Sequence, residues 1–415
     1  MYFLGVQKGI LLAKRIVKAP FRMIGNSVLN GKAEHYIRKM TETPVKDRIK
    51  VGFIVQMPEL WDKQSSVYAK MAADPDFEVT LIIVPAYDLA AETVGEYSSE
   101  KEFFCNACLN GSYILAKDGD RFVDISQEGF DFLFYQRPYD HYLPDTLKSS
   151  TAVRFTRACY VPYATPEIKK TSIYPVNFFR NLYFGFMEDS GAAEVNMQKL
   201  HKNSDGVQHF MSVGYPPFEK CMTIRSECRY RSFLWTPRWS YDPVVGGSHF
   251  LEYYQQLTDY DWGDAELTVR PHPMMWDNFI KNNFLTAEQA ETIRQQWAER
   301  HILTDQNKSI EDTFVTADVM ISDRSSVIPM FFLTGKPVIY CPIECEYGSL
   351  FSAILPGLYL ANDWSELEKY IRMLSAHEDP LLETRQKIIA EYFGSNQSAT
   401  DNIVQAIKKE SSRLK

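Results

Sequence analysis

The stretch "ADVMISDRSSVIPMFFLTGKPVIYCP" (Ala317 to Pro342) carries the clearest structural pattern of the chain. It predicts a buried strand, a polar elbow, a helix, a Gly-Lys-Pro helix stop and a second buried strand. A strand, a helix and a second strand in this order form one unit of a parallel sheet. The elbow, Ser322 to Ser326, therefore comes at the carboxyl end of a strand, where open α/β sheets bind their ligands.

The same alternation of short apolar runs and helical segments continues through both halves of the chain. In the N-terminal half, strands are expected within residues 49–56, 77–85 and 130–136, with a crossover helix within 60–75. In the C-terminal half, strands are expected within 231–239, 266–273, 301–305, 318–322 and 336–342, with helices within 285–300 and 326–335. The pattern predicts two α/β halves with parallel sheets, which meet near residues 215–230.

The length of 415 residues fits two domains better than one. We expect a basic N-terminal segment over residues 1–45, an N-terminal domain over 46–222 and a C-terminal domain over 223–415. The C-terminal domain includes the closing helices expected within 378–393 and up to residue 409. Two domains imply a cleft, which is a natural place for a small-molecule site.

Composition argues against several classes of function. The net charge of −8 disfavours a nucleic-acid-binding protein, since affinity for phosphate backbones needs a surplus of Lys and Arg. Seven cysteines, an odd number, do not describe a disulfide framework and fit a reducing compartment such as the cytoplasm. The single Cys105-x-x-Cys108 has no second pair and no nearby His, so chance spacing explains it better than a metal or redox site.

The first 33 residues are basic in an otherwise acidic chain, with six Lys or Arg residues and no acid. Apolar residues between Leu4 and Val17 recur at roughly helical spacing. The segment up to Pro20 fits an amphipathic helix on an anionic membrane surface, and it fits equally a helix packed on the body of the protein. No run of about 18–20 apolar residues occurs, so we expect no membrane-spanning helix.

Three strand-end loops of the C-terminal half carry the candidate binding residues. They are Thr236-Pro237-Arg238-Trp239, Arg270-Pro271-His272-Pro273 and the elbow. Ser325 or Ser326 is the expected N-cap of the helix that follows, and Pro329 falls in or just past its first turn. Free N–H groups at the start of that helix suit an anion, and Arg324 adds a donor.

An ordinary capped helix explains the elbow when the elbow is considered alone. The second loop changes this balance, because two prolines stiffen it around one imidazole and one guanidinium. His272 can donate to a phosphate oxygen or protonate a leaving group, and Arg270 can offer a bidentate fork. Together the loops favour a phosphate-binding site.

The loop "LTVRPHP" and the stretch from Ala317 to Pro342 together resemble the C-terminal half of the CDP-glycerol glycerophosphotransferases, enzymes of teichoic-acid and capsule synthesis. The resemblance is specific over residues 230–345. It implies a GT-B-like α/β fold, with two Rossmann-like domains whose parallel sheets face a central cleft. It also implies a CDP-activated polyol as the donor. The residues expected to bind this donor are Thr236, Arg238, Arg270, Asp323, Arg324, Ser325 and Ser326, with His272 at the phosphates and Glu311 near the ribose or base.

The N-terminal half supplies a partial match. Its segment "YVPYATPEIKK" is similar to the Trp-His-Gly-Thr-Pro-Leu-Lys segment of the family, whose His is thought to activate the acceptor hydroxyl. Tyr163 occupies the His position, and a tyrosine with an ordinary pKa is a poor base at neutral pH. Asp140 or His141 is the alternative base. A second departure is Arg324, which stands where the family has an aromatic residue.

The resemblance implies that an acceptor hydroxyl attacks the donor phosphorus and expels CMP. Because GT-B enzymes hold the diphosphate with helix ends and basic side chains, no metal and no cofactor are expected beside the donor substrate. Three Asp-x-Asp pairs fit solvated loops better than metal sites. They are Asp74/Asp76, Asp118/Asp120 and Asp259/Asp261.

The expected acceptor is a cell-surface polymer or its lipid-linked precursor. The basic N-terminus suits peripheral contact with the inner face of an anionic plasma membrane. Two other functions stay open. One is a GT-B glycosyltransferase that uses a UDP- or CMP-sugar, and the other is a non-catalytic nucleotide-binding scaffold.

Overall fold

The computed structural model of the protein describes residues 28–88, 91–165, 176–200, 209–224, 226–242, 247–307, 309–343 and 345–415. These residues form two compact units, which are described separately. Unit 1 contains the described residues up to Tyr163, those between 176 and 212, and residues 400–415. Unit 2 contains those between Val213 and Ala399, together with Ala164 and Thr165. The predicted amphipathic segment up to Pro20 lies outside the described residues.

Unit 1 is built on a seven-stranded sheet in the order β11-β10-β9-β8-β1-β2-β5, in which every pairing is parallel. The strands are β1 (Ile49–Val55), β2 (Phe77–Ile83), β5 (Ser112–Leu115), β8 (Phe132–Tyr135), β9 (Arg157–Tyr160), β10 (Phe184–Met187) and β11 (His209–Ser212). Two short antiparallel pairs extend from it, β3 (Tyr87–Asp88) with β4 (Thr93–Val94) and β6 (Lys117–Asp118) with β7 (Arg121–Phe122). The central strand β8 is buried along its whole length, and β1 is buried at every position except Lys50, because both faces of the sheet are covered.

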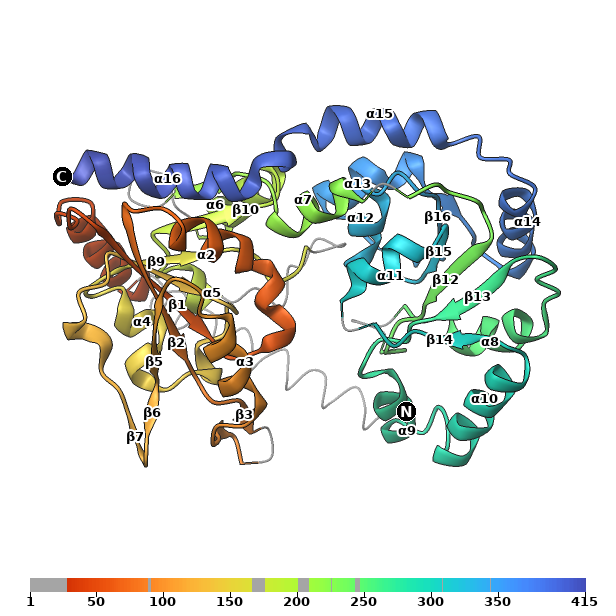
Figure 1. The fold of residues 1–415 in the computed structure, drawn as a ribbon, viewed down its shortest axis with the longest axis horizontal. Coiled ribbons are helices and arrows are strands. Elements are labelled where there is room, and N and C mark those ends of the chain that lie inside the picture. The colour runs from red at the N-terminus through yellow and green to blue at the C-terminus, as the bar shows by residue number, and fades with distance from the viewer. Residues whose placement is uncertain are drawn as a thin grey trace, which may run out of the picture. The chain divides into compact units, whose positions relative to one another are not determined.

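Helices connect these strands and flank the sheet (Figure 1). They are a helix over residues 28–40, η1 (Pro58–Lys63), α2 (Ser65–Ala72), α3 (Ser99–Ala107), η2 (Ile125–Gln127), η3 (Asp140–Tyr142), η4 (Asp145–Leu147), α4 (Ser149–Ala152), α5 (Val176–Phe179), α6 (Ser190–Lys199) and α16 (Ala399–Leu414). The predicted crossover between the first two strands is confirmed as η1 followed by α2.

The last helix, α16, belongs to unit 1 and not to unit 2. Lys408 forms ion pairs with Asp74 (2.6 Å) and Asp76 (2.7 Å) in the turn before β2. Glu410 accepts a short hydrogen bond from the hydroxyl of Tyr183. The two units therefore differ from the domain boundaries expected from the sequence, because residues 400–415 belong to unit 1 and the main part of unit 2 begins at Val213.

Unit 2 contains a six-stranded parallel sheet in the order β14-β13-β12-β15-β16-β17. Its strands are β12 (Ser232–Thr236), β13 (Glu266–Val269), β14 (Leu303–Thr304), β15 (Val319–Ser322), β16 (Val338–Tyr340) and β17 (Tyr359–Leu360). Its helices are α7 (Pro216–Thr223), α8 (Phe250–Asp259), α9 (Met275–Lys281), α10 (Ala287–Glu299), α11 (Ile310–Thr316), α12 (Val327–Phe332), α13 (Ser349–Ile354), η5 (Leu355–Gly357), α14 (Trp364–Ser375), α15 (Leu382–Tyr392) and η6 (Gly394–Ser398). These helices surround the sheet in Figure 1.

Aromatic packing fixes the helices of unit 2 on the sheet. The indole of Trp235 on β12 stacks on the ring of Phe250 in α8, with centroids 5.4 Å apart. Trp297 of α10 completes this contact and donates a hydrogen bond to Thr258 (3.0 Å). Trp235 precedes the loop between β12 and α8, and Phe250 follows it, so their stacking fixes both ends of this loop. Residues of this loop contribute to the candidate site.

Every strand and helix expected in the quoted stretch from Ala317 to Pro342 is confirmed. It forms β15, the elbow, α12 and β16, with β15 and β16 paired in parallel. Gly335 ends the helical segment with a φ of 83°, a conformation that residues with a Cβ rarely adopt. None of the described helices is long and apolar enough to cross a membrane.

Candidate active site

Three strands of unit 2 end side by side at the candidate site. Trp235 of β12 pairs with Val269 of β13, and Thr236 pairs with Ser322 of β15. The loops that follow these strands therefore start at the same edge of the sheet, as the sequence predicted. They enclose a small cavity of about 100 Å³.

The cavity is lined by basic and neutral residues. They are Thr236, Pro237, Arg238, Arg270, Pro271, His272, Pro273, Ile310, Arg324, Ser325 and Val327. No carboxylate occurs among these lining residues. Six of the residues predicted from the sequence are thus brought together in one cavity, which is electropositive and suits an anion. The other predicted residues of this unit, Asp323, Ser326 and Glu311, do not line it.

The elbow caps its helix differently from the prediction. Ser326 occupies the N-cap position of α12, but its side chain makes no capping hydrogen bond. The hydroxyl of Ser325 instead accepts a long contact of 3.4 Å from the N–H of Val327. Pro329 falls in the first turn, as expected. Because α12 has only six residues, we assign the anion preference of the cavity to its side chains and not to the dipole of this helix.

Arg238 connects two of the loops. Its guanidinium Nη1 donates a hydrogen bond to the main-chain carbonyl of Arg324 (2.8 Å), and its guanidinium carbon Cζ lies 5.9 Å from the ring centre of Trp239. Its main-chain N–H donates to the carboxylate of Asp323 (2.9 Å). Both the backbone and the side chain of Arg238 are therefore tied to the elbow.

Arg270 is less available than the sequence suggested. Its Nη1 donates to the carboxylate of Asp305, to the carbonyl of Asn307 (2.9 Å) and to the hydroxyl of Thr313 (3.1 Å). Burial raises the pKa of Asp305, but hydrogen bonds from Thr313 and Arg270 outweigh it and lower the pKa overall. The Nη1 atom of Arg270 is thus occupied by the Asp305 carboxylate, which makes the predicted bidentate contact with a phosphate less favourable.

His272 presents one defined tautomer to its surroundings. Its Nδ1 accepts a hydrogen bond from the N–H of Met274 (3.2 Å), so the neutral ring carries its proton on Nε2. Desolvation, followed by the charge of Arg238, lowers the pKa of His272 to about 4. The unliganded ring is neutral at pH 7. It can donate an N–H hydrogen bond to a phosphate oxygen, whereas the predicted role as a protonated acid is disfavoured in this state.

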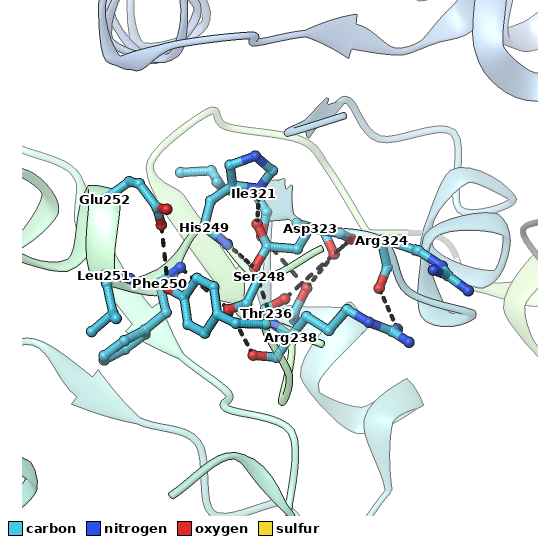
Figure 2. Close-up of polar contacts among 12 residues, drawn as sticks. Thr236, Arg238, Ser248, His249, Phe250, Leu251, Glu252, Ile321, Asp323 and Arg324 are labelled. Atoms are coloured by element: carbon cyan, nitrogen blue, oxygen red, sulfur yellow. Dashed lines mark hydrogen bonds and ion pairs between the residues drawn. The ribbon is translucent and has the colours of Figure 1, made fainter. Parts of the chain in front are cut away.

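Asp323 and His249 form a contact that the sequence did not reveal. Figure 2 shows the carboxylate of Asp323 between the ring of His249 and the backbone of Arg238. The Nδ1 atom of His249 lies 3.0 Å from Oδ1 of Asp323, and the main-chain N–H of His249 donates to Oδ2 (3.2 Å). These residues are 74 positions apart, and His249 has no motif around it, so no sequence signal could have found the pair.

Glu311, predicted near the ribose or base, is buried at the start of α11 instead. Its N–H donates to the Ser309 hydroxyl (3.2 Å), and that hydroxyl in turn donates to its carboxylate. Lys220 approaches the same carboxylate at 3.8 Å. These contacts give Glu311 a role in capping α11.

The candidate bases lie in unit 1. The hydroxyl of Tyr163 contacts that of Tyr139 (3.0 Å), and burial together with this contact raises the pKa of Tyr163 above its ordinary value. Asp140 accepts two hydrogen bonds from Ser149 at the start of α4, and burial raises its pKa. His141 is exposed and lines a groove of about 1360 Å³. Geometry therefore leaves His141 as the accessible one of the three.

Cys108 of the Cys-x-x-Cys motif and the pair Asp74/Asp76 have protein partners. The thiol of Cys108 donates to the carbonyl of Ser112 (3.1 Å), and Asp74 and Asp76 pair with Lys408. No group of three His, Cys, Asp or Glu side chains within the described ranges is arranged to hold a metal ion.

Comparison with known proteins supports the family suspected from the sequence. Residues 249–409 match the family described as CDP-glycerol:poly(glycerophosphate) glycerophosphotransferase. The resemblance is thereby confirmed over the part of the chain that runs from the loop before α8 to α16. No curated protein sequence matches the chain.

Among the solved structures that resemble this chain are three that cover 87% to 98% of it. The wall teichoic acid polymerase TagF has 12% identical residues and a TM-score of 0.52, with 98% of each chain covered. The UDP-GlcNAc 2-epimerase of Neisseria meningitidis bound to UDP-GlcNAc has 11% identity and a TM-score of 0.56, with 87% of this chain and 100% of that chain covered. MnaA of S. aureus with UDP has 12% identity and a TM-score of 0.51, with 87% and 96% covered. These likenesses confirm the predicted GT-B-like α/β fold.

Proposed function

We propose that this chain, whose residues 249–409 match the CDP-glycerol glycerophosphotransferase family, transfers a polyol phosphate from a CDP-activated donor to a hydroxyl group. The polyol phosphate is glycerol phosphate or a close relative. The acceptor is a cell-surface polymer or its lipid-linked precursor. The observation that carries the proposal is the convergence of Arg238, Arg324 and His272 on one cavity at the ends of three parallel strands.

The cavity is sized for one part of the donor. Pockets that enclose a whole small ligand usually measure about 300–1,000 Å³. A volume of about 100 Å³ therefore fits the diphosphate and leaves the nucleoside and the polyol outside it. The arginines supply positive charge, and the Nε2–H of His272 supplies a directed hydrogen bond.

The same groups suit the chemistry of transfer. An acceptor hydroxyl attacks the phosphorus that carries the polyol, a new P–O bond forms, and the bond to the CMP oxygen breaks. Negative charge grows on the departing CMP, and preorganised donors from Arg238 and His272 stabilise it. The donor is a substrate, and the proposed reaction needs no cofactor.

The proton of the acceptor hydroxyl needs a base. We assign this role to His141, because its ring is exposed on a groove, whereas Tyr163 is held by Tyr139 and Asp140 by Ser149. Peripheral contact with an anionic membrane, on the cytoplasmic side, completes the proposal. Its support is the run of basic residues before residue 33.

The test is release of free nucleotide from a panel of donors. CDP-glycerol, CDP-ribitol, UDP-sugars and CMP-sugars are offered with a short poly(glycerol phosphate) or a lipid-linked acceptor. We expect CMP from a CDP-polyol only. Arg238→Ala and His272→Ala are each expected to lower kcat/KM about 10²- to 10³-fold, as loss of one preorganised donor does.

A matched control is Arg229→Ala, since Arg229 is an exposed arginine of unit 2 that forms a surface ion pair with Glu227 (3.1 Å) and does not line the cavity. Its activity should equal that of the wild type. Turnover of a UDP- or CMP-sugar alone would assign the chain to the glycosyltransferases. Nucleotide binding with no release from any donor would identify a scaffold.

A further inference from the structure

A buried carboxylate stands directly behind the anion-binding cavity. Asp323 is 1% exposed and adjoins Arg324, which lines the cavity. A negative charge next to a cavity-lining residue opposes the binding of a diphosphate. The repulsion is large because the buried carboxylate is shielded from water. A site for an anion at this place needs something that balances the charge of Asp323.

Both oxygens of the Asp323 carboxylate are occupied. Oδ2 accepts hydrogen bonds from the main-chain N–H groups of Arg238 (2.9 Å) and His249 (3.2 Å). Oδ1 lies 3.0 Å from Nδ1 of His249. Of these partners, only the imidazole can bring a positive charge to the contact (Figure 2).

The environment of His249 favours its charged form. Burial lowers the pKa of His249, but the hydrogen bond and the charge of Asp323, together with the charge of Glu252 in α8, raise it overall. The ring stacks on Tyr253, with centroids 5.6 Å apart and an interplanar angle of 10°. Other titratable groups near the pair are the hydroxyls of Tyr253 and Tyr241 and the thiol of Cys341, and burial raises the pKa of each. All three are neutral near pH 7, so they add no charge.

A continuous chain of contacts links His249 to the cavity. Ser248, its neighbour in the sequence, donates from its hydroxyl to the carbonyl of Arg238 (2.9 Å), while Asp323 holds the N–H of the same residue. The backbone of Arg238 is thus fixed from both sides. Its guanidinium then donates to the carbonyl of Arg324 (2.8 Å), which fixes the elbow.

We propose that His249 is a positioning residue for the donor diphosphate, which balances the charge of Asp323 and holds Arg238 and the elbow in the geometry that receives the anion. The inference rests on the proposed function for the identity of the donor. The anion-binding role itself is independent of the nucleotide, and this allows the two to be tested separately.

The test compares three variants by calorimetric titration with inorganic pyrophosphate and with CDP. His249→Ala removes both the charge and the hydrogen bond. His249→Asn keeps a donor where Nδ1 stood and removes only the charge. His249→Ala combined with Asp323→Asn removes the carboxylate charge as well. Thermal unfolding of every variant shows whether it is folded.

We expect His249→Ala to weaken binding of both probes about 10- to 100-fold, which corresponds to about 1.4–2.8 kcal/mol. His249→Asn should weaken it less, about three- to tenfold. The double variant should bind more tightly than His249→Ala, because the uncompensated charge is gone. In steady-state assays, His249→Ala should raise the KM for the donor more than it lowers kcat.

Asp379→Asn is the matched control. Asp379 is another buried carboxylate of unit 2, which accepts hydrogen bonds from Arg385 and from Tyr359 (2.7 Å) and does not line the cavity. It should lower the melting temperature and leave pyrophosphate affinity unchanged.

A purely structural His249 would give a different result. Its alanine variant would melt earlier but bind pyrophosphate as the wild type does, or the double variant would bind no better than the single one. Either result overturns the inference. If the wild type binds pyrophosphate but releases no CMP from any donor, the proposed function fails, and the pyrophosphate titrations still decide the role of His249.

Discussion

Two buried carboxylates lie behind the same cavity, and the protein balances their charges in different ways. Asp305 follows β14 and contacts the guanidinium of Arg270. Asp323 follows β15 and contacts the imidazole of His249. An arginine stays charged at every pH at which the protein is folded, whereas a histidine titrates near neutrality. Asp305 is therefore balanced by an arginine that is always charged, whereas Asp323 is balanced by a histidine whose charge depends on pH.

The pKa shifts agree with this contrast. Hydrogen bonds from Thr313 and Arg270 lower the pKa of Asp305 below its ordinary value. The pKa of His249 is raised above 6.5. The first pair thus contributes stability above the ordinary pKa of an aspartate, and the second contributes it below the ordinary pKa of a histidine.

Arg270→Ala should produce the largest loss of stability. Asp305 is 4% exposed and would keep a buried charge without its cation. Breaking a buried pair costs about 3–5 kcal/mol, and because the Arg270 side chain is 24% exposed we expect about 2–3 kcal/mol. Urea denaturation at pH 7 measures this change. The exposed control Arg229→Ala should stay within about 0.5 kcal/mol of the wild type. An equally small loss for Arg270→Ala would show that the Arg270–Asp305 pair does not stabilise the fold.

His249→Ala should cost less, about 1–2 kcal/mol at pH 6, since it removes one hydrogen bond between charged groups. The main-chain contacts to Asp323 from Arg238 and from residue 249 itself remain. The same denaturation experiment gives this value. A loss larger than that of Arg270→Ala would show that the histidine pair, and not the arginine pair, is the stronger support of the cavity.

The two pairs should respond differently to pH. Because the folded pKa of His249 is raised, its stabilisation is fully present below pH 6.5 and is lost as pH rises through the folded pKa. The difference in unfolding free energy between wild type and His249→Ala should therefore shrink between pH 6 and pH 9. The difference for Arg270→Ala should stay constant over this range, because Asp305 loses its charge only below its lowered pKa. Parallel slopes for both variants would contradict the contrast.

His272 should give the smallest effect, which is spectroscopic. In the free protein its ring should titrate well below pH 6.5, since desolvation and the charge of Arg238 lower its pKa. Pyrophosphate in the cavity should raise that pKa, because an anion favours the imidazolium. NMR titration of the imidazole protons, assigned with His272→Gln, measures both values. An unchanged pKa in saturating pyrophosphate would place the anion away from His272.

The fold could be predicted from the sequence because its signals are local. The runs that form β1 and β15 are apolar except for Lys50 and Ser322, and strands buried on both faces need a mostly apolar composition. The positions of Arg238, His272 and Arg324 followed from one rule, that loops after parallel strands meet at one edge. The order of strands and helices along the chain was thus enough to predict that most of the residues lining the cavity lie close together.

The features that the sequence could not reveal depend on contacts between distant residues. The partner of Asp323 lies 74 positions away at the start of α8, and only the pairing of β12 with β15 brings the two together. The commitment of Arg270 to Asp305 and the burial of Glu311 are likewise properties of packed side chains. Periodicity describes which face a residue occupies, and it does not describe what that residue touches.

The return of α16 to unit 1 has a consequence for synthesis on the ribosome. Unit 1 begins early in the chain, yet Asp74 and Tyr183 find their partners Lys408 and Glu410 only in the last helix. Domains usually fold as they emerge, the N-terminal one first. Here the first unit to emerge cannot complete its packing until unit 2 has been translated, so the nascent chain exposes that unfinished surface while the remaining residues are made.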